Sequence, residues 1–223
     1  MADYYSEHLS AERLRRCYEV APARVRQYLD AEVEHAAGRI RPGDAVLELG
    51  CGYGRVMERL AANAGLLVGV DTSRSSLQLG RRLLSKARNC RLLRMNAISL
   101  GFRDRVFDVV FCIQNGVSAF HVDQRTLIAE AVRVMRPGGR VLFSSYSANF
   151  WQHRLEWFQL QADHGLLGEI DHAATGDGVI VCQDGFTATT IGPDEFVALT
   201  SGLDLDADIQ EVDESSIFCE IVA

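Results

Sequence analysis

Five short apolar runs alternate with amphipathic segments in the middle of this 223-residue chain. Runs of this length that are rich in Val, Leu, Ile and Phe are typical of strands buried on both faces of a sheet. The five runs cover 45–49, 66–70, 90–95, 107–113 and 140–145. Helical spacing of apolar residues predicts helices over 56–64, 73–87 and 123–135. Strands and helices in this order predict a parallel sheet that carries helices on both faces.

The two ends of the chain follow other patterns. Apolar residues at helical spacing predict two helices within the first forty residues, and Pro22 starts the second. The elements predicted after the fifth strand are a helix over 150–164, a hairpin around Asp184-Gly185, a helix over 193–201 and strands over 205–212 and 217–222. A chain of this length suits one domain, 1–223. Its predicted parts are a helical lid over 1–40, a core over 41–147, a cap region over 148–204 and final strands over 205–223.

Composition and charge exclude several classes of protein. Hydrophobic residues make up 48% of the chain and charged residues 24%, as in an ordinary globular protein. The formal net charge of −7 argues against a broad nucleic-acid footprint, which needs clustered Lys and Arg. No apolar run approaches the roughly 20 residues that span a bilayer, and the first residues lack the regions of a signal peptide. We therefore expect a cytoplasmic protein that binds neither nucleic acid nor membrane.

The cysteines are scattered along the chain. They stand at positions 17, 51, 90, 112, 182 and 219. No two of them form a Cys-x-x-Cys pair, the spacing that metal sites favour. They can be reduced thiols that pack like small apolar residues, or they can converge in space as a site for a soft metal. We predict the first arrangement and no metal site.

A glycine-rich turn follows the first predicted strand. Gly50, Gly52 and Gly54 occupy alternate positions, and glycine lets a ligand approach the backbone closely. The nicotinamide-dinucleotide fingerprint needs its third glycine one place later, where this chain has Arg55. The Gly-Lys-Ser/Thr ending of a P-loop is also missing. The turn therefore favours a ligand whose ribose and amino-acid parts lie against the backbone.

Two carboxylates accompany this turn. Asp71 ends the second strand, where an acidic side chain can accept both hydroxyls of a ribose. It can also simply cap the helix that follows, and we favour the ligand role. Glu48 stands inside the first strand, where an unpaired charge is unfavourable. We expect Glu48 to orient the turn or to reach an ammonium group of the ligand through water.

Five motifs extend the pattern. They are Glu-Leu-Gly-Cys-Gly-Tyr-Gly from 48, Val-Gly-Val-Asp-Thr-Ser from 68, Met-Asn-Ala from 95, Phe-Asp-Val-Val-Phe-Cys-Ile-Gln-Asn from 107 and Arg-Pro-Gly-Gly-Arg-Val-Leu-Phe from 136. In this order and spacing they resemble the motifs of class I S-adenosylmethionine-dependent methyltransferases. The resemblance covers about residues 40 to 147. It implies an α/β, Rossmann-like, doubly wound fold: a seven-stranded, mostly parallel sheet with an antiparallel final strand, N-terminal helices and a small cap insertion after the fifth strand.

The resemblance also implies a cofactor, S-adenosylmethionine, with S-adenosylhomocysteine as product, and a role for each motif. The core would bind the cofactor and the cap region would bind the acceptor. The cofactor-binding residues would be Gly50, Cys51 and Gly52 at the methionine part, Asp71 and Thr72 at the ribose, Asn96 and Ala97 at the adenine, Ile113 and Gln114 near the sulfonium, and Glu48 beside the turn. Asn115 would also lie near the sulfonium, on the acceptor side.

The sequence carries fewer motifs for the residues that would bind the acceptor. The Asn/Asp-Pro-Pro-Tyr/Phe signature of base-modifying and glutamine-modifying members is absent, and Gln114-Asn115-Gly116-Val117 stands in its place. Candidate catalytic and acceptor-binding residues are His121 and Tyr146, which follow the fourth and fifth strands, and His153 is a weaker candidate base. Tyr5 and Trp151 are candidate acceptor contacts, and each can instead belong to ordinary packing.

These observations favour methyl transfer to N, O or S of a small-molecule acceptor by in-line displacement. One alternative is a methyltransferase that acts on protein or peptide side chains. The other is a non-catalytic protein that only binds S-adenosylmethionine. The pattern leaves monomer and homodimer equally open.

Overall fold

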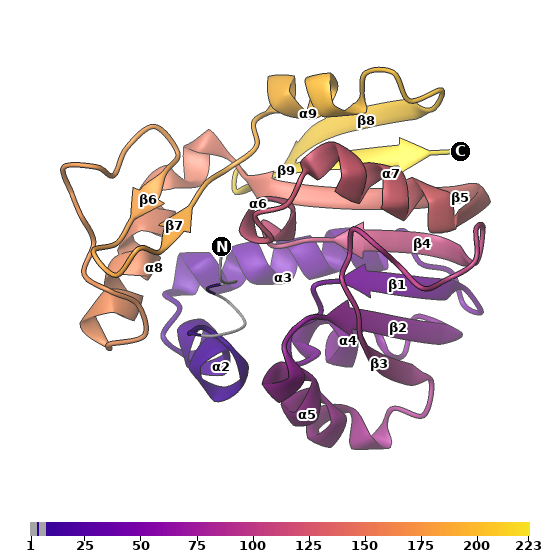
Figure 1. The fold of residues 1–223 in the computed structure, drawn as a ribbon, viewed down its shortest axis with the longest axis horizontal. Coiled ribbons are helices and arrows are strands. Elements are labelled where there is room, and N and C mark those ends of the chain that lie inside the picture. Colours follow the sequence, from indigo (N-terminus) through magenta and orange to yellow (C-terminus); the bar gives the residue numbers. More distant parts are fainter. Residues whose placement is uncertain (1–3, 5–7) are drawn as a thin grey trace.

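The structure is a computed structural model that describes Tyr4 and residues 8–223. Its centre is a seven-stranded sheet in the order β3-β2-β1-β4-β5-β9-β8 (Figure 1). The strands are β1 (Ala45–Leu49), β2 (Leu66–Asp71), β3 (Cys90–Arg94), β4 (Phe107–Cys112), β5 (Met135–Tyr146), β8 (Asp206–Val212) and β9 (Ser216–Val222). The first five are mutually parallel, and β9 runs antiparallel to both β5 and β8. The predicted fold class, including the antiparallel final strand, is confirmed.

Helices cover both faces of this sheet. One face carries α3 (Ala23–Ala37), α4 (Arg55–Leu60) and α5 (Arg74–Leu83), and the other carries α7 (Gln124–Val134) and α9 (Pro193–Thr200). Successive side chains of a strand point to opposite faces. Val46 of β1 accordingly packs with the first group of helices and Leu47 with the second. This burial on both sides explains the nearly continuous apolar runs of the central strands β1, β2 and β4, whereas the edge strands β3 and β8 are largely exposed.

Several elements differ from their predicted bounds. β5 begins at Met135, which pairs with Phe107 before the register shifts towards Val109. α4 ends at Leu60 rather than at 64, and the helix predicted over 73–87 continues past α5 as a 3-10 turn, η1 (Leu84–Lys86). Two short elements, α6 (Gly116–Ala119) and η2 (Ala148–Phe150), were not predicted because they lack a hydrophobic period.

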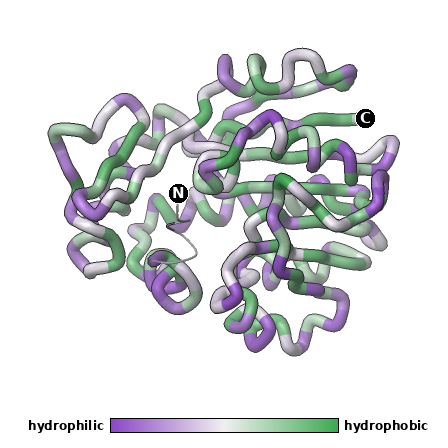
Figure 2. The backbone as a smooth tube through the Cα atoms, viewed as in Figure 1, coloured by the Kyte–Doolittle hydropathy of each residue, from purple (hydrophilic) through white to green (hydrophobic). Residues whose placement is uncertain are grey.

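A separate apolar cluster lies beside the sheet. It joins α2 (Ala11–Glu19) and α3 to α8 (Trp151–Asp163) and to the hairpin of β6 (Ile180–Val181) and β7 (Thr187–Ala188). Figure 1 shows α2 and α8 together at one end of the molecule, and Figure 2 shows hydrophobic segments running through both this end and the sheet. The cap is therefore built from the two N-terminal helices together with residues that follow β5.

The predicted cap region contains one element that packs elsewhere. Phe196 of α9 is fully buried in the cluster of the sheet and α7. We therefore propose that the predicted lid over 1–40 and the part of 148–204 that precedes α9 form one structural unit, and that α9 belongs to the core.

Within the described residues, no helix is long and apolar enough to cross a membrane.

Candidate functional site

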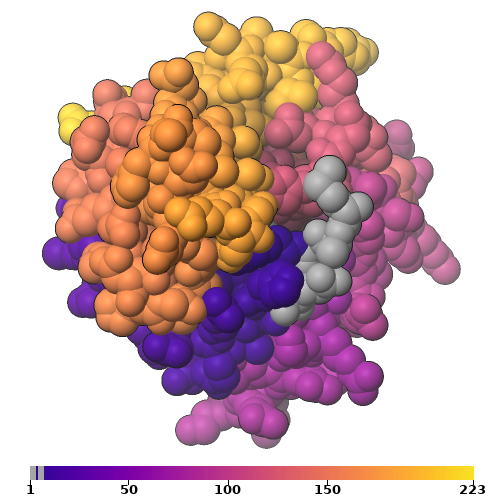
Figure 3. Space-filling view, turned by 60° about the vertical axis from the view of Figure 1, so that its left-hand side comes forward, coloured from indigo at the N-terminus to yellow at the C-terminus, as the bar shows by residue number. Residues whose placement is uncertain are grey.

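A cavity of about 1190 Å³ lies between the carboxyl ends of the parallel strands and the cap. Ligands of open α/β sheets bind at this edge. The predicted site residues that line it are Glu48, Gly50, Cys51, Gly52, Asp71, Thr72, Asn96, Ala97, Ile113, Gln114, His121 and Tyr146. Figure 3 shows the N-terminal residues, in indigo, between the orange cap segment and the magenta core. The fold thus gathers all ten predicted cofactor contacts around one space.

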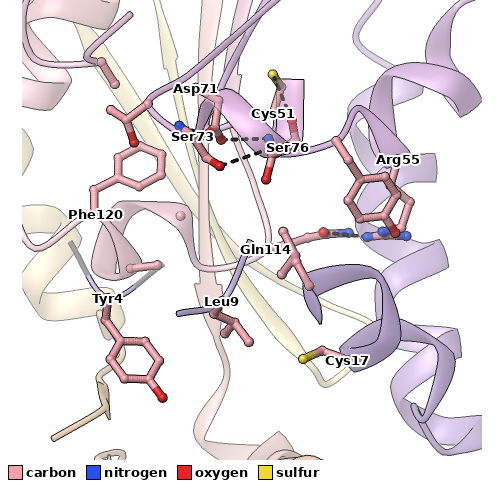
Figure 4. Close-up of a pocket in the computed structure, with 18 of the residues that line it drawn as sticks. Tyr4, Leu9, Cys17, Cys51, Arg55, Asp71, Ser73, Ser76, Gln114 and Phe120 are labelled. Carbon is pink, nitrogen blue, oxygen red and sulfur yellow. Dashed lines mark hydrogen bonds between the residues drawn. The ribbon is translucent and has the colours of Figure 1, made fainter. Parts of the chain in front are cut away.

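Asp71 links the glycine turn to the end of β2 through hydrogen bonds. Its Oδ2 accepts the Gly52 N–H at 2.8 Å and its Oδ1 accepts the Ser73 N–H at 2.7 Å (Figure 4). The N–H groups of Gly50 and Cys51 both donate to the Val70 carbonyl. Asp71 therefore holds two backbone segments together. A carboxylate can accept about four hydrogen bonds, so these two are compatible with further ones from a ribose.

Four buried polar atoms of residues that line the cavity lack a hydrogen-bond partner in the described part of the chain. Glu48 Oε2, Arg55 Nε and Gln114 Nε2 belong to the core side of the wall, and the Tyr28 hydroxyl belongs to α3. Arg55 donates to Gln114 Oε1 at 2.5 Å, as Figure 4 shows, and its guanidinium lies 4.2 Å from the centre of the Tyr18 ring. Buried polar groups are nearly always paired. The core side of the wall therefore presents one acidic group and two N–H donors, which suit the ammonium and the carboxylate of an amino acid.

Burial raises the pKa of Glu48 to about 8, with Arg55 opposing the rise and Asp71 adding to it. An unfolded glutamate has a pKa of about 4.3, so between these values the native chain binds more protons than the unfolded chain. The free energy of unfolding is therefore expected to fall as the pH rises from about 5 to about 8. Glu48→Gln should flatten this slope in urea titrations across that pH range. The exposed Glu58→Gln is the control, and an equal slope in both variants would refute the assignment.

The turn after β4 carries two successive residues in the left-handed region, Gln114 with φ 60° and Asn115 with φ 62°. Asn115 is buried and does not line the cavity. Its amide donates to the Thr189 carbonyl at 2.9 Å and accepts from the Ser145 hydroxyl at 2.8 Å. The structure therefore places Asn115 as a link between β4, β5 and the chain after β7, away from the acceptor position that we predicted.

The backbone of this turn is held by a residue that the sequence analysis missed. The Gln114 N–H donates to Glu32 Oε2 at 2.6 Å and to the Ser144 hydroxyl at 2.8 Å. Glu32 belongs to α3 and is fully buried. A signal for it exists in the sequence, because Glu32 stands on the same helical stripe as the apolar residues Leu29 and Val33.

The two candidate catalytic residues differ in environment. His121 is exposed and lines the cavity. Tyr146 is buried, with its ring centre 5.3 Å from that of Tyr28 and 4.6 Å from the Arg154 guanidinium. Burial raises the pKa of Tyr146 well above its usual range. At neutral pH Tyr146 is therefore a neutral phenol, which is able to donate a hydrogen bond and is poorly suited to act as a base.

The cap side of the cavity is mostly aromatic. Its ring-bearing residues are Tyr4, Tyr18, Tyr28, Tyr146, Trp157, Phe158 and Phe186. Trp151 lies outside this lining, with its ring 5.7 Å from the Arg154 guanidinium. His153 is also outside it, on an exposed side of α8. Tyr5 lies outside the described residues.

Tyr4 and helix α2 form hydrogen bonds on both sides of the cavity. The Ala11 N–H donates to the Ser76 hydroxyl of α5 at 2.9 Å. On the cap side, Arg13 donates to the Leu166 carbonyl at 3.0 Å and the Tyr4 hydroxyl donates to Asp184 at 2.5 Å.

The described residues contain no group of three or more His, Cys, Asp or Glu arranged to hold a metal ion. All six thiols are free and buried.

Comparison with known proteins gives matches over the core. A family model described as a methyltransferase domain matches residues 46–139. The chain is 35% identical over 124 residues to a demethylmenaquinone methyltransferase of Symbiobacterium thermophilum, an alignment that covers 52% of this chain and 47% of the relative. It is 33% identical over 116 residues to a ubiquinone/menaquinone biosynthesis C-methyltransferase of Vibrio campbellii, which covers 48% and 43% respectively. The chain therefore matches less than half the length of these relatives.

The likeness in fold extends further along the chain. The structure of the PH0226 protein from Pyrococcus horikoshii superposes with a TM-score of 0.67 at 19% sequence identity. This superposition covers 91% of this chain and 92% of that protein. The likeness in fold thus extends well beyond residues 46–139, which the family model matches.

Proposed function

We propose, from the premise that this chain belongs to the class I S-adenosylmethionine-dependent methyltransferases, that it transfers a methyl group from S-adenosylmethionine to a small molecule. The observation that carries the proposal is the single cavity that joins the clamped glycine turn to an aromatic cap. Its volume of about 1190 Å³ exceeds the roughly 300–1,000 Å³ of a site for one small ligand. A donor and a second small molecule fit such a space together.

The residues around the turn suit each part of S-adenosylmethionine. Asp71 and Thr72 would hold the ribose, and Asn96 and Ala97 would border the adenine. Glu48 would pair with the ammonium, while Arg55 and the Gln114 amide would donate to the carboxylate. The last three contacts would satisfy three of the four unpartnered buried atoms of the cavity lining, all but the Tyr28 hydroxyl. Because these three groups match the two charges of a zwitterion, they support the assignment. Gly50, Cys51, Gly52 and Ile113 would complete the wall.

The sulfonium of the donor supplies a methyl group that is already activated by positive charge. The chain's own task is then to align an acceptor with that group and to exclude water. The aromatic residues of the cap provide a dry surface for the acceptor. The cap closes against the core through α2, where the Ala11 N–H donates to the Ser76 hydroxyl of α5. We assign His121 as a candidate base for acceptors that must lose a proton, and Tyr146 as a hydrogen-bond donor to the acceptor.

An apolar, ring-bearing acceptor suits the aromatic lining best. Two curated relatives are named for methylation in quinone biosynthesis, and one of these names specifies a C-methyltransferase. These names support a carbon atom of the acceptor's ring as a further possible methylation site, besides N, O and S. A methyltransferase for protein side chains would need a long open groove, whereas the cap here borders a cavity. A non-catalytic binding protein would retain the donor contacts and transfer no methyl group.

The proposal predicts that S-adenosylhomocysteine stabilises the protein. At 100 times its dissociation constant a ligand of the native state adds about 2.7 kcal/mol, which for a chain of this size raises the melting temperature by roughly 5–11 °C. Differential scanning fluorimetry measures the shift, with adenosine as the control ligand because it lacks the amino-acid part. No shift at millimolar S-adenosylhomocysteine would refute donor binding. Transfer of a labelled methyl group to hydroquinones, phenols or amines would then separate the enzyme from a non-catalytic binder.

A further inference from the structure

Glu32 is a fully buried carboxylate that the proposed function does not use. It lies on α3 and does not line the cavity. Its Oε2 accepts the Gln114 N–H at 2.6 Å, and its Oε1 accepts the Ser216 hydroxyl at 2.7 Å. Glu32 therefore lies behind the Gln114 turn, where it ties the lid helix to β4 and to the start of β9.

The turn that Glu32 holds needs such support. Gln114 and Asn115 both adopt the left-handed conformation, which residues other than glycine rarely adopt in succession. A backbone in an unfavourable region persists only where surrounding contacts determine it. The side chain of Gln114 continues from this backbone into the cavity, where its Oε1 accepts from Arg55 at 2.5 Å. The direction of that side chain thus depends on a backbone that Glu32 fixes together with the Ser144 hydroxyl.

We propose that Glu32 is a positioning residue for the methyl-transfer site: by accepting the Gln114 N–H and the Ser216 hydroxyl, it holds the Gln114 side chain against Arg55 in the cavity wall. The inference rests on the proposed function for its effect on catalysis. Its structural part concerns the free protein alone and can be tested without a cofactor.

The groups around Glu32 determine its charge. Burial raises its pKa to about 7, and the hydrogen bonds from Ser216, Ser144 and Gln114 oppose the rise, as does the positive charge of Arg55. The other titratable groups that face it are Tyr28 on α3, Cys112 on β4 and Tyr146 on β5. Burial raises the pKa of each, and the negative charge of Glu32 adds to the rise. These three groups stay neutral near pH 7. Glu48, whose pKa burial raises to about 8, is a second carboxyl close to Arg55. A titration near pH 7 at the Gln114 amide that persists in Glu48→Gln and is lost in Glu32→Gln therefore belongs to Glu32.

Two substitutions separate the parts of this role. Glu32→Leu keeps the volume but removes both acceptor atoms. Glu32→Gln can still accept the Gln114 N–H through its carbonyl oxygen while its NH₂ donates to the Ser216 hydroxyl. Glu220→Gln is the matched control, because Glu220 is a buried carboxylate that pairs with Arg39 and Arg140 away from the cavity.

The experiment has two readouts. In ¹H–¹⁵N spectra of the free protein, the Gln114 amide should titrate with a midpoint near pH 7 in the wild type and in Glu220→Gln, and should not titrate in Glu32→Gln. The titration should persist in Glu48→Gln. At pH 8, Glu32→Leu should raise the dissociation constant of S-adenosylhomocysteine at least about 10-fold, the scale expected for losing a charge-assisted hydrogen bond. Glu32→Gln should remain within about 3-fold of the wild type.

Each result decides the inference. A Gln114 amide that does not titrate in the wild type overturns it, as does a Glu32→Leu protein that binds S-adenosylhomocysteine like Glu220→Gln. If Glu32→Leu fails to fold, the wild-type and Glu32→Gln titrations still decide the structural part. If the wild type binds no S-adenosylhomocysteine while the amide titrates as expected, the proposed function fails and the role of Glu32 in holding the turn stands.

Discussion

Asp71→Ala is expected to weaken the binding of S-adenosylhomocysteine by at least about 10-fold, measured by isothermal titration calorimetry. The carboxylate holds the N–H groups of Gly52 and Ser73, so its loss releases the glycine turn from the end of β2. It would also remove charge-assisted hydrogen bonds to the ribose, each worth about 1.5–3 kcal/mol. These two losses act on the same ligand, and the effect is therefore among the largest that one substitution in the site can have.

Two further variants separate these contributions. Asp71→Asn keeps one acceptor oxygen and should give an intermediate dissociation constant. Asp44→Ala is the matched control, because Asp44 also accepts a backbone N–H, that of Arg41 at 2.7 Å, just before β1 and away from the cavity. Asp44→Ala should lower stability and leave binding unchanged. A dissociation constant for Asp71→Ala within about 2-fold of the wild type would remove Asp71 from the binding site.

Gly50→Ala is expected to reduce both stability and donor binding. Gly50 has φ 73°, a conformation that costs a residue with a Cβ roughly 1–2 kcal/mol. Its Cβ would also lie 2.3 Å from Cζ of Phe120, so the ring must move within the cavity that both residues line. We expect a lower melting temperature and at least about a 10-fold weaker affinity for S-adenosylhomocysteine.

Gly138→Ala provides the control for backbone strain. Gly138 has φ 76°, and a Cβ there would meet no atom within 4 Å. This variant should lose a similar amount of stability through strain and bind the donor normally. Gly50→Ala combined with Phe120→Ala should regain part of the lost affinity, because it removes the clash and keeps the strain. Equal binding by the Gly50 and Gly138 variants would show that the close approach to Phe120 has no effect on the ligand.

The donor half of the site was readable from the sequence because its signals are local. A glycine turn after a buried strand and an acidic residue at the end of the next strand lie within about 25 residues of each other. In a parallel sheet the carboxyl ends of neighbouring strands meet at one edge, so a correct strand order also brings Asn96, Ile113 and Gln114 to the turn. All ten predicted cofactor contacts line the cavity for this reason, and their roles stay predictions.

The residues on the cap side of the cavity were harder to predict from the sequence, because the contacts that place them join distant parts of the chain. Trp157 on α8 donates to the Cys17 carbonyl at 2.8 Å, across 140 residues. Trp151, six residues earlier on the same helix, lies outside the cavity lining. Composition alone does not distinguish the two tryptophans. Asn115 was misplaced for a similar reason, since its partners Ser145 and Thr189 lie 30 and 74 residues away.

The sequence by itself determined the sheet, its helices and the edge at which the glycine turn and Asp71 meet, because each depends on the period of apolar residues and on backbone freedom at single positions. Only the tertiary structure decided which side chains close the cavity, where the cap lies and what holds the Gln114 turn. The physical reason is that burial depends on every element that packs around a group. Glu32, on the apolar stripe of α3, became the partner of Gln114 only when α3, β4 and β9 met.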